Sequence, residues 1–158
     1  MLTTGTLSSR LVAVGASTGG TEAMARLFKL LPHPFPGIVV VQHLPPSFTG
    51  LYAKRLDKDL AFNVQEAADN VRIMPNSIYI APGNRHLLVE RRGGLCYTRL
   101  GDSDRVNGHC PSVDVLFNSV ANELGRHAIG IILTGMGADG AMGLLHMRNR
   151  GSYTIGQD

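Results

Sequence analysis

Short, continuous runs of apolar residues recur along the chain and are separated by longer segments of mixed polarity. Three of these runs are rich in aliphatic or β-branched side chains: residues 11–14, 37–41 and 128–133. Apolar runs of this length without alternation are typical of strands buried on both faces, as in a parallel sheet. We therefore predict three buried strands, and we expect a further strand over residues 152–157.

The segments between the predicted strands carry apolar residues at helical spacing. After the first run, apolar side chains occupy the i, i+3, i+4 and i+7 positions of an amphipathic helix: Met24, Leu27, Phe28 and Leu31. Ser112 can cap a second helix with the same period: Val113, Leu116, Phe117, Val120 and Leu124. Further helices are predicted over residues 47–56 and 138–150. Strands and helices that alternate in this way imply a mostly parallel sheet covered on both faces.

The two remaining regions of the chain do not follow this alternation. Between Phe62 and Arg99, short strand-like runs flank a Gly93-Gly94 turn, which indicates a hairpin. Residues 1–10 are rich in serine and threonine, and we expect a disordered lead or a linker remnant there. The fold prediction is one α/β domain over residues 11–158, a three-layer α/β/α sandwich around a mostly parallel sheet with a small β-hairpin excursion.

Composition narrows the class of protein. The 158 residues are 44% hydrophobic and 17% charged, as in globular domains, and the formal net charge of +3 is too small to indicate nucleic-acid binding. No apolar stretch reaches the roughly 18 to 20 residues that span a bilayer, and no signal peptide is visible, so we expect a cytoplasmic protein without membrane insertion. Cys96 and Cys110 match no disulfide, metal or redox motif, and we expect neither a metal nor a cofactor.

Three reactive side chains follow the predicted strands: Ser17, His43 and Asp139. In a parallel sheet the carboxyl ends of the strands share one edge, where ligands bind. A hydroxyl, an imidazole that takes its proton and a carboxylate that orients the imidazole are the groups that serine hydrolases use for acyl transfer. The pattern therefore predicts a hydrolytic site at this edge.

Each of these residues also has a simpler interpretation. Residues 15–19 match G-x-S-x-G, in which glycines allow a sharp turn that exposes the serine, but the same glycines also suit a phosphate loop or a plain turn. His43 could be a surface histidine beside prolines, and Asp139 could cap the helix that follows it. The glycines around Met136 could aim its backbone N–H at a bound oxygen. Five other histidines compete for the role of base: His33, His86, His109, His127 and His146.

Five sequence blocks resemble one known family. In chain order they read VAVGASTGGTEA, VVVQHLPPSFT, IYIAPGNRHLLV, PSVDVLFNSVA and ILTGMGADGAMGL. Together they resemble the catalytic domain of the chemotaxis protein-glutamate methylesterase family (CheB). The similarity extends over roughly residues 11–158, and five ordered blocks are far more specific than any single motif.

This resemblance implies a function and assigns residues to it. The expected activity is hydrolysis of methyl esters on glutamate side chains of chemoreceptors during chemotaxis adaptation, with release of methanol, and in many members deamidation of receptor glutamines. The family's nucleophile, general base and carboxylate correspond to Ser17, His43 and Asp139. Its oxyanion donors correspond to the backbone N–H groups of Thr18 and Met136. The implied partners are the methylated cytoplasmic helices of chemoreceptors.

Two departures from the family pattern concern regulation and completeness. Family members usually carry an N-terminal receiver domain and continue past the "YTIGQD" block with another strand and helix. We expect this chain to lack both, which makes a receiver domain on another chain a candidate partner. Two alternative functions also follow from the sequence: a catalytically idle module that docks receptor tails, and a nucleotide-binding domain that uses Gly15–Gly20.

Overall fold

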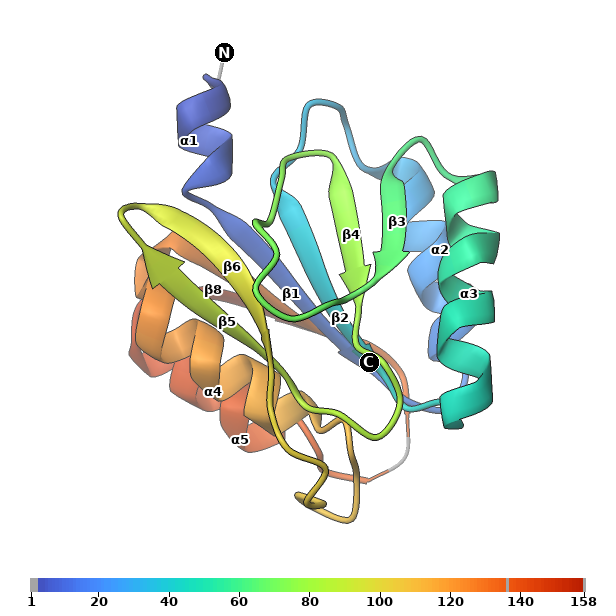
Figure 1. The fold of residues 1–158 in the computed structure, drawn as a ribbon. Coiled ribbons are helices and arrows are strands. Elements are labelled where there is room, and N and C mark those ends of the chain that lie inside the picture. The colour runs from blue at the N-terminus through green and yellow to red at the C-terminus, as the bar shows by residue number, and fades with distance from the viewer. Residues whose placement is uncertain (1–2, 136, 158) are drawn as a thin grey trace.

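A six-stranded sheet forms the centre of the computed structural model, which describes residues 3–135 and 137–157 (Figure 1). Its strands are β1 (Leu11–Ala16), β2 (Gly37–Gln42), β3 (Asn63–Glu66), β4 (Ser77–Ile80), β7 (Ala128–Ile132) and β8 (Tyr153–Gly156). They lie in the order β3-β4-β2-β1-β7-β8, and each neighbouring pair is parallel. The predicted parallel sheet is confirmed.

Helices cover both faces of this sheet, as the three-layer prediction requires (Figure 1). The helices are α2 (Gly20–Leu30) and α3 (Pro46–Asp59) on one face, and α4 (Val113–Leu124) and α5 (Ala141–Asn149) on the other. A 3₁₀ turn, Gly125–His127, leads from α4 into β7. None of these helices, nor any other in the described ranges, has the length and apolar character needed to cross a membrane.

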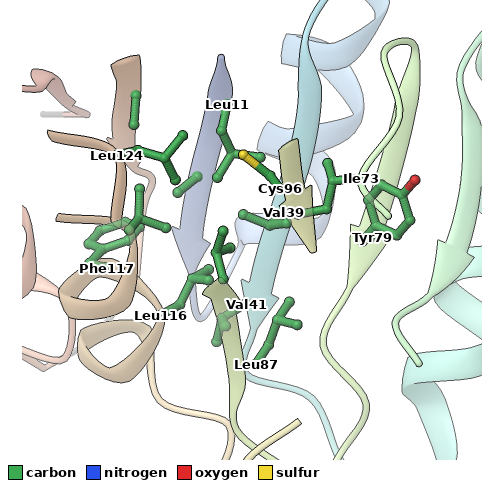
Figure 2. Close-up of a cluster of buried hydrophobic side chains, with 14 of the residues drawn as sticks. Leu11, Val39, Val41, Ile73, Tyr79, Leu87, Cys96, Leu116, Phe117 and Leu124 are labelled. Carbon is green, nitrogen blue, oxygen red and sulfur yellow. The ribbon is translucent and has the colours of Figure 1, made fainter. Parts of the chain in front are cut away.

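Two hydrophobic cores lie on the two sides of the sheet, because successive side chains of a strand point to opposite faces. Val12 belongs to the cluster that contains Phe28 of α2, whereas its neighbour Leu11 belongs to the cluster that contains Phe117 of α4. Figure 2 shows this second cluster, which also includes Leu87 from outside the main sheet. Strands β1 and β2 contribute to both cores, which explains their continuous apolar runs.

The predicted hairpin is present as strands β5 (Leu87–Arg92) and β6 (Leu95–Leu100), which pair antiparallel in a separate two-stranded sheet. Its turn contains Gly93 and Gly94, as the sequence indicated. Buried side chains of both strands pack into the α4 core. The chain leaves β6 through residues 101–112 and reaches the start of α4, and this loop supplies several groups of the site described below.

The first residues differ from the disordered lead that the sequence suggested. Residues Thr4–Ser8 form a short helix, α1, whose N-cap hydroxyl on Thr3 accepts a hydrogen bond from the Thr6 N–H at 3.2 Å. Leu7 is buried. One capping bond and one apolar anchor order a segment that is too short to show helical periodicity in its sequence.

Candidate active site

Three adjacent central strands, β2, β1 and β7, deliver the site residues to one edge of the sheet. Ser17 follows the last residue of β1, His43 follows β2, and Asp139 lies in the loop between β7 and α5. All three line one small cavity of about 40 Å³. The structure thus brings together the three side chains that the sequence singled out.

The backbone of Ser17 is fixed on both sides of the strand-to-helix turn. Its N–H donates to the carbonyl of Thr134 at 3.2 Å, and its own carbonyl accepts from the Gly20 N–H at 2.9 Å. Gly19, within this turn, has a φ of 78°, a left-handed conformation that glycine adopts without strain. These contacts hold the serine at the mouth of the turn with its side chain partly exposed.

Gln42 is a site residue that the sequence analysis missed. Its side chain is buried, and its Nε2 donates to the Ser17 carbonyl at 2.8 Å. The other amide atom, Oε1, has no hydrogen-bond partner among the described residues. A glutamine between the apolar run and His43 is the signal in the sequence, because a buried polar side chain requires a partner.

His43 and Asp139 form a hydrogen-bonded pair, with His43 Nε2 at 2.8 Å from Asp139 Oδ2. The side chains are 12% and 2% exposed. An ionised carboxylate only accepts hydrogen bonds, so Nε2 carries the proton and Nδ1 of the neutral ring has a free lone pair. Nδ1 is buried and has no hydrogen-bond partner in the described part of the chain. It is therefore the nitrogen that can accept a proton.

The Asp139 carboxylate accepts five hydrogen bonds of 2.7–3.1 Å. The donors are His43 Nε2, Asn107 Nδ2, Ser112 Oγ and the backbone N–H groups of Val113 and Asp114. Burial raises the pKa of Asp139, but these hydrogen bonds, led by that from His43, outweigh burial and hold the pKa well below its usual range. The carboxylate is therefore ionised at neutral pH.

The capping role considered for Asp139 takes a different form from the one expected. The N-cap of α5 is Gly140, and no side chain caps that helix. Asp139 instead accepts the first N–H groups of α4, beside the N-cap Ser112. An anion at a helix N-terminus satisfies free N–H groups and interacts favourably with the helix dipole. Asp139 thus joins the start of α4 to His43.

Of the two expected oxyanion donors, Thr18 lies among the described residues and Met136 does not. Thr18 lies in the exposed turn before α2, and its N–H makes no hydrogen bond to another described residue. Met136 lies outside the described residues. Its neighbour Gly135 approaches Ser17 so closely that a Cβ on Gly135 would lie 2.5 Å from the Cβ of Ser17. The β7–α5 loop therefore packs directly against the serine.

Of the competing histidines, His109 alone lies against His43. The two rings stack with centroids 3.7 Å apart and planes 5° apart. His86 is buried, accepts the Ser112 N–H at Nδ1 and contacts the Asp104 carbonyl through Nε2, so it supports the loop. The other two whose side chains form hydrogen bonds contact asparagines away from the cavity: His33 and His146.

A groove of about 310 Å³ adjoins the cavity and gives access to His43. Its lining includes Pro45, Asn84, Arg105 and His109. Within the described ranges, no three His, Cys, Asp or Glu side chains are grouped so that they could hold a metal ion. The site thus offers a hydroxyl and a hydrogen-bonded imidazole, which are groups that hydrolyse an acyl bond. The groove leaves them open to a substrate.

A parallel three-layer α/β domain with a serine and a His–Asp pair at the carboxyl edge of its sheet has the architecture of an α/β serine hydrolase. Residues 12–158 match the model of the CheB methylesterase family. The chain belongs to this family.

Individual relatives agree with this assignment. Over 151 residues the chain is 51% identical to the protein-glutamate methylesterase/protein-glutamine glutaminase of Yersinia pestis and 49% identical to that of Escherichia coli. Each alignment covers 96% of this chain and 43% of the relative, so the chain spans less than half the length of these curated relatives. The CheB methylesterase catalytic domain of Thermotoga maritima superposes with a TM-score of 0.88 at 38% identity, over 92% of this chain and 78% of that chain.

Proposed function

We propose that this chain hydrolyses methyl esters of glutamate side chains, with Ser17 as nucleophile, His43 as general base and Asp139 as the carboxylate that orients His43. The observation that carries the proposal is the His43–Asp139 hydrogen bond, which leaves Nδ1 of His43 unpartnered among the described residues while His43 and Ser17 line one cavity. The names of the relatives support the choice of a glutamate methyl ester as substrate.

The reaction proceeds through an acyl-serine. Nδ1 of His43 takes the hydroxyl proton as Ser17 Oγ bonds to the ester carbonyl carbon. The bond to the methoxy group then breaks, and the proton passes from His43 to this group, so that methanol leaves. Water adds to the acyl-serine with His43 again as base, which releases the glutamate side chain and free Ser17. Asp139 stays ionised and stabilises the imidazolium in both steps.

Oxyanion stabilisation comes from backbone N–H groups in this proposal. The Thr18 N–H is one donor, since it follows the nucleophile directly and is not engaged by another described residue. The Met136 N–H is the other, assigned from the motif that it shares with the family. Two donors aimed at the developing negative charge are worth several kcal/mol of barrier in comparable enzymes, about 3 kcal/mol for one donor.

The proposed substrates are the methylated cytoplasmic helices of chemoreceptors, and the proposed location is the cytoplasm. The same acyl-serine forms from a glutamine side chain with loss of ammonia, so deamidation of receptor glutamines is included in the proposal. The glutaminase in the relatives' names supports it. A receiver domain, on this or another polypeptide, is the proposed regulator.

Ser17→Ala tests the function. We expect it to abolish methanol release from a methylated chemoreceptor fragment, because Ser17 carries the only hydroxyl among the described residues that line the cavity. Ser103→Ala is the matched control, since Ser103 is exposed in the loop before α4 and contributes no side-chain hydrogen bond to the described residues. Methanol release by Ser17→Ala at the wild-type rate would rule out the mechanism. Failure of a fluorophosphonate probe to label the wild-type serine would favour an idle docking module.

A further inference from the structure

A tight turn in the loop before α4 lies against the His43–Asp139 pair. Val106 and His109 exchange backbone hydrogen bonds of 2.9 and 3.0 Å across two residues. Those two, Asn107 and Gly108, have φ values of 56° and 78°, the positive values of a type I′ turn. An Asn-Gly pair adopts this turn with little strain, so the backbone of the segment is well defined.

Both ends of this turn contact the site. Asn107 Nδ2 donates to Asp139 Oδ1 at 3.0 Å and to Asp114 Oδ2 at 2.6 Å. The ring of His109 lies flat on the ring of His43, with centroids 3.7 Å apart and planes 5° apart. One hydrogen-bonded turn of four residues therefore touches both members of the pair.

We propose that the Val106–His109 turn positions the general base, with His109 stacking on His43 to fix the plane of its imidazole and Asn107 fixing Asp139. This inference rests on the proposed function. His109 acts through His43 and is a positioning residue. It lines the groove but is absent from the lining of the small cavity that contains Ser17, so His43 is the better-placed base.

A second group is needed because one hydrogen bond does not orient a ring. The Nε2–Oδ2 contact fixes one atom of the His43 ring, and the ring can still tilt about it. Tilting changes the direction in which Nδ1 points, and proton transfer from the serine hydroxyl depends on that direction. A flat ring 3.7 Å away blocks the tilt on one face.

The surroundings of His109 favour its neutral form. Burial lowers the pKa of His109, the adjacent His43 and Arg105 lower it further, and Asp139 opposes them. A neutral ring can stack on His43 without adding a positive charge beside the imidazolium that forms during the reaction. Stacking of this kind supports the transition state as well as the resting state.

Two substitutions at His109 separate stacking from other roles. His109→Ala removes the flat face, and we expect kcat for methanol release to fall on the order of 100-fold with KM nearly unchanged, the size of effect that a misplaced catalytic group produces. His109→Phe restores a flat ring without any titratable nitrogen, and we expect it to recover most of kcat. Ser103→Ala, in the same loop but outside the turn and with its side chain exposed, is the control and retains wild-type kcat.

The outcomes distinguish this inference from the proposed function. An inactive wild-type chain would contradict the proposed function, and ¹⁵N NMR of the His43 ring would then decide the positioning role by itself. We expect the Nε2–H resonance shared with Asp139 to be sharp in the wild type and in His109→Phe, and broadened by ring motion in His109→Ala. An active wild type whose His109→Ala variant keeps kcat and this resonance would overturn the inference.

Discussion

At the scale of single residues, Asp139 links the chemistry to the fold. Its carboxylate holds the proton-bearing nitrogen of His43 and also accepts the first free N–H groups of α4. A buried anion is costly unless every lone pair is satisfied, and five donors satisfy this one. Loss of the charge should therefore affect stability as well as catalysis.

Asp139→Asn tests both consequences. We expect kcat to fall by about 10⁴, as when a triad carboxylate becomes an amide. Because the folded pKa of Asp139 lies below its usual value, ionised Asp139 stabilises the fold above the unfolded pKa of about 4, and this contribution is lost as the pH falls toward the folded pKa. Urea unfolding at several pH values from 7 to 2 should show a larger free energy of unfolding for the wild type than for Asp139→Asn at pH 7. The difference between the two proteins should become smaller as the pH falls. A gap that is independent of pH would contradict the role of the charge.

The sequence identified the residues that follow strands but not those that support them. Ser17, His43 and Asp139 could be placed together because each comes directly after or close to a buried strand, and parallel strands end at one edge. The contacts of Asn107 and His109 could not be predicted, because the path of a loop depends on what it packs against rather than on local periodicity. The oxyanion roles of Thr18 and Met136 stay predictions.

At the scale of elements, the sequence predicted those strands and helices whose hydrophobic pattern has only one interpretation. The central strands are apolar on both faces and could not be confused with surface helices. Strand β3 was missed because it lies at an edge of the sheet, and of its four residues only Val64 is buried. Helix α1 was missed because one turn shows no period. Short elements are determined by tertiary contacts that the local sequence does not display.

The β7–α5 loop gives a test at this scale. Gly135→Ala would place a Cβ 2.5 Å from the Cβ of Ser17, so either the loop or the serine turn must move. We expect kcat to fall on the order of 100-fold, because small displacements of catalytic groups have effects of this size. The melting temperature should change little, since Gly135 lies in an exposed loop.

Gly50→Ala is the matched control for that substitution. Gly50 lies inside α3, where a Cβ would meet only ordinary contact, 3.5 Å from Glu66 Oε2. We expect it to stabilise the protein by about 0.5–1 kcal/mol, the cost of glycine relative to alanine within a helix, with wild-type kcat. If Gly135→Ala kept wild-type kcat as Gly50→Ala does, the loop would not support Ser17.

At the scale of the whole molecule, two cores share one sheet. Each face of β1 and β2 packs against a different pair of helices, so neither core can form without the strands that also serve the other.

Phe117→Ala on one side of the sheet and Phe28→Ala on the other should each lower the free energy of unfolding by about 3–5 kcal/mol, as for buried phenylalanines in general. Urea unfolding measures the loss of stability in both variants. Leu30→Ala is the control and should have little effect, because Leu30 is 82% exposed. A near-neutral effect at either phenylalanine would show that its core contributes little.

The hydrogen bond between His43 and Asp139 joins positions 96 residues apart in the chain. Helices form from near neighbours within microseconds, whereas parallel strands joined by long connections pair slowly, because the entropy of closing each loop is lost before any contact compensates for it. A chain recovering from denaturation therefore regains helix content before His43 and Asp139 meet. The presence of the His43–Asp139 hydrogen bond is consequently a stricter criterion of correct folding than helical content.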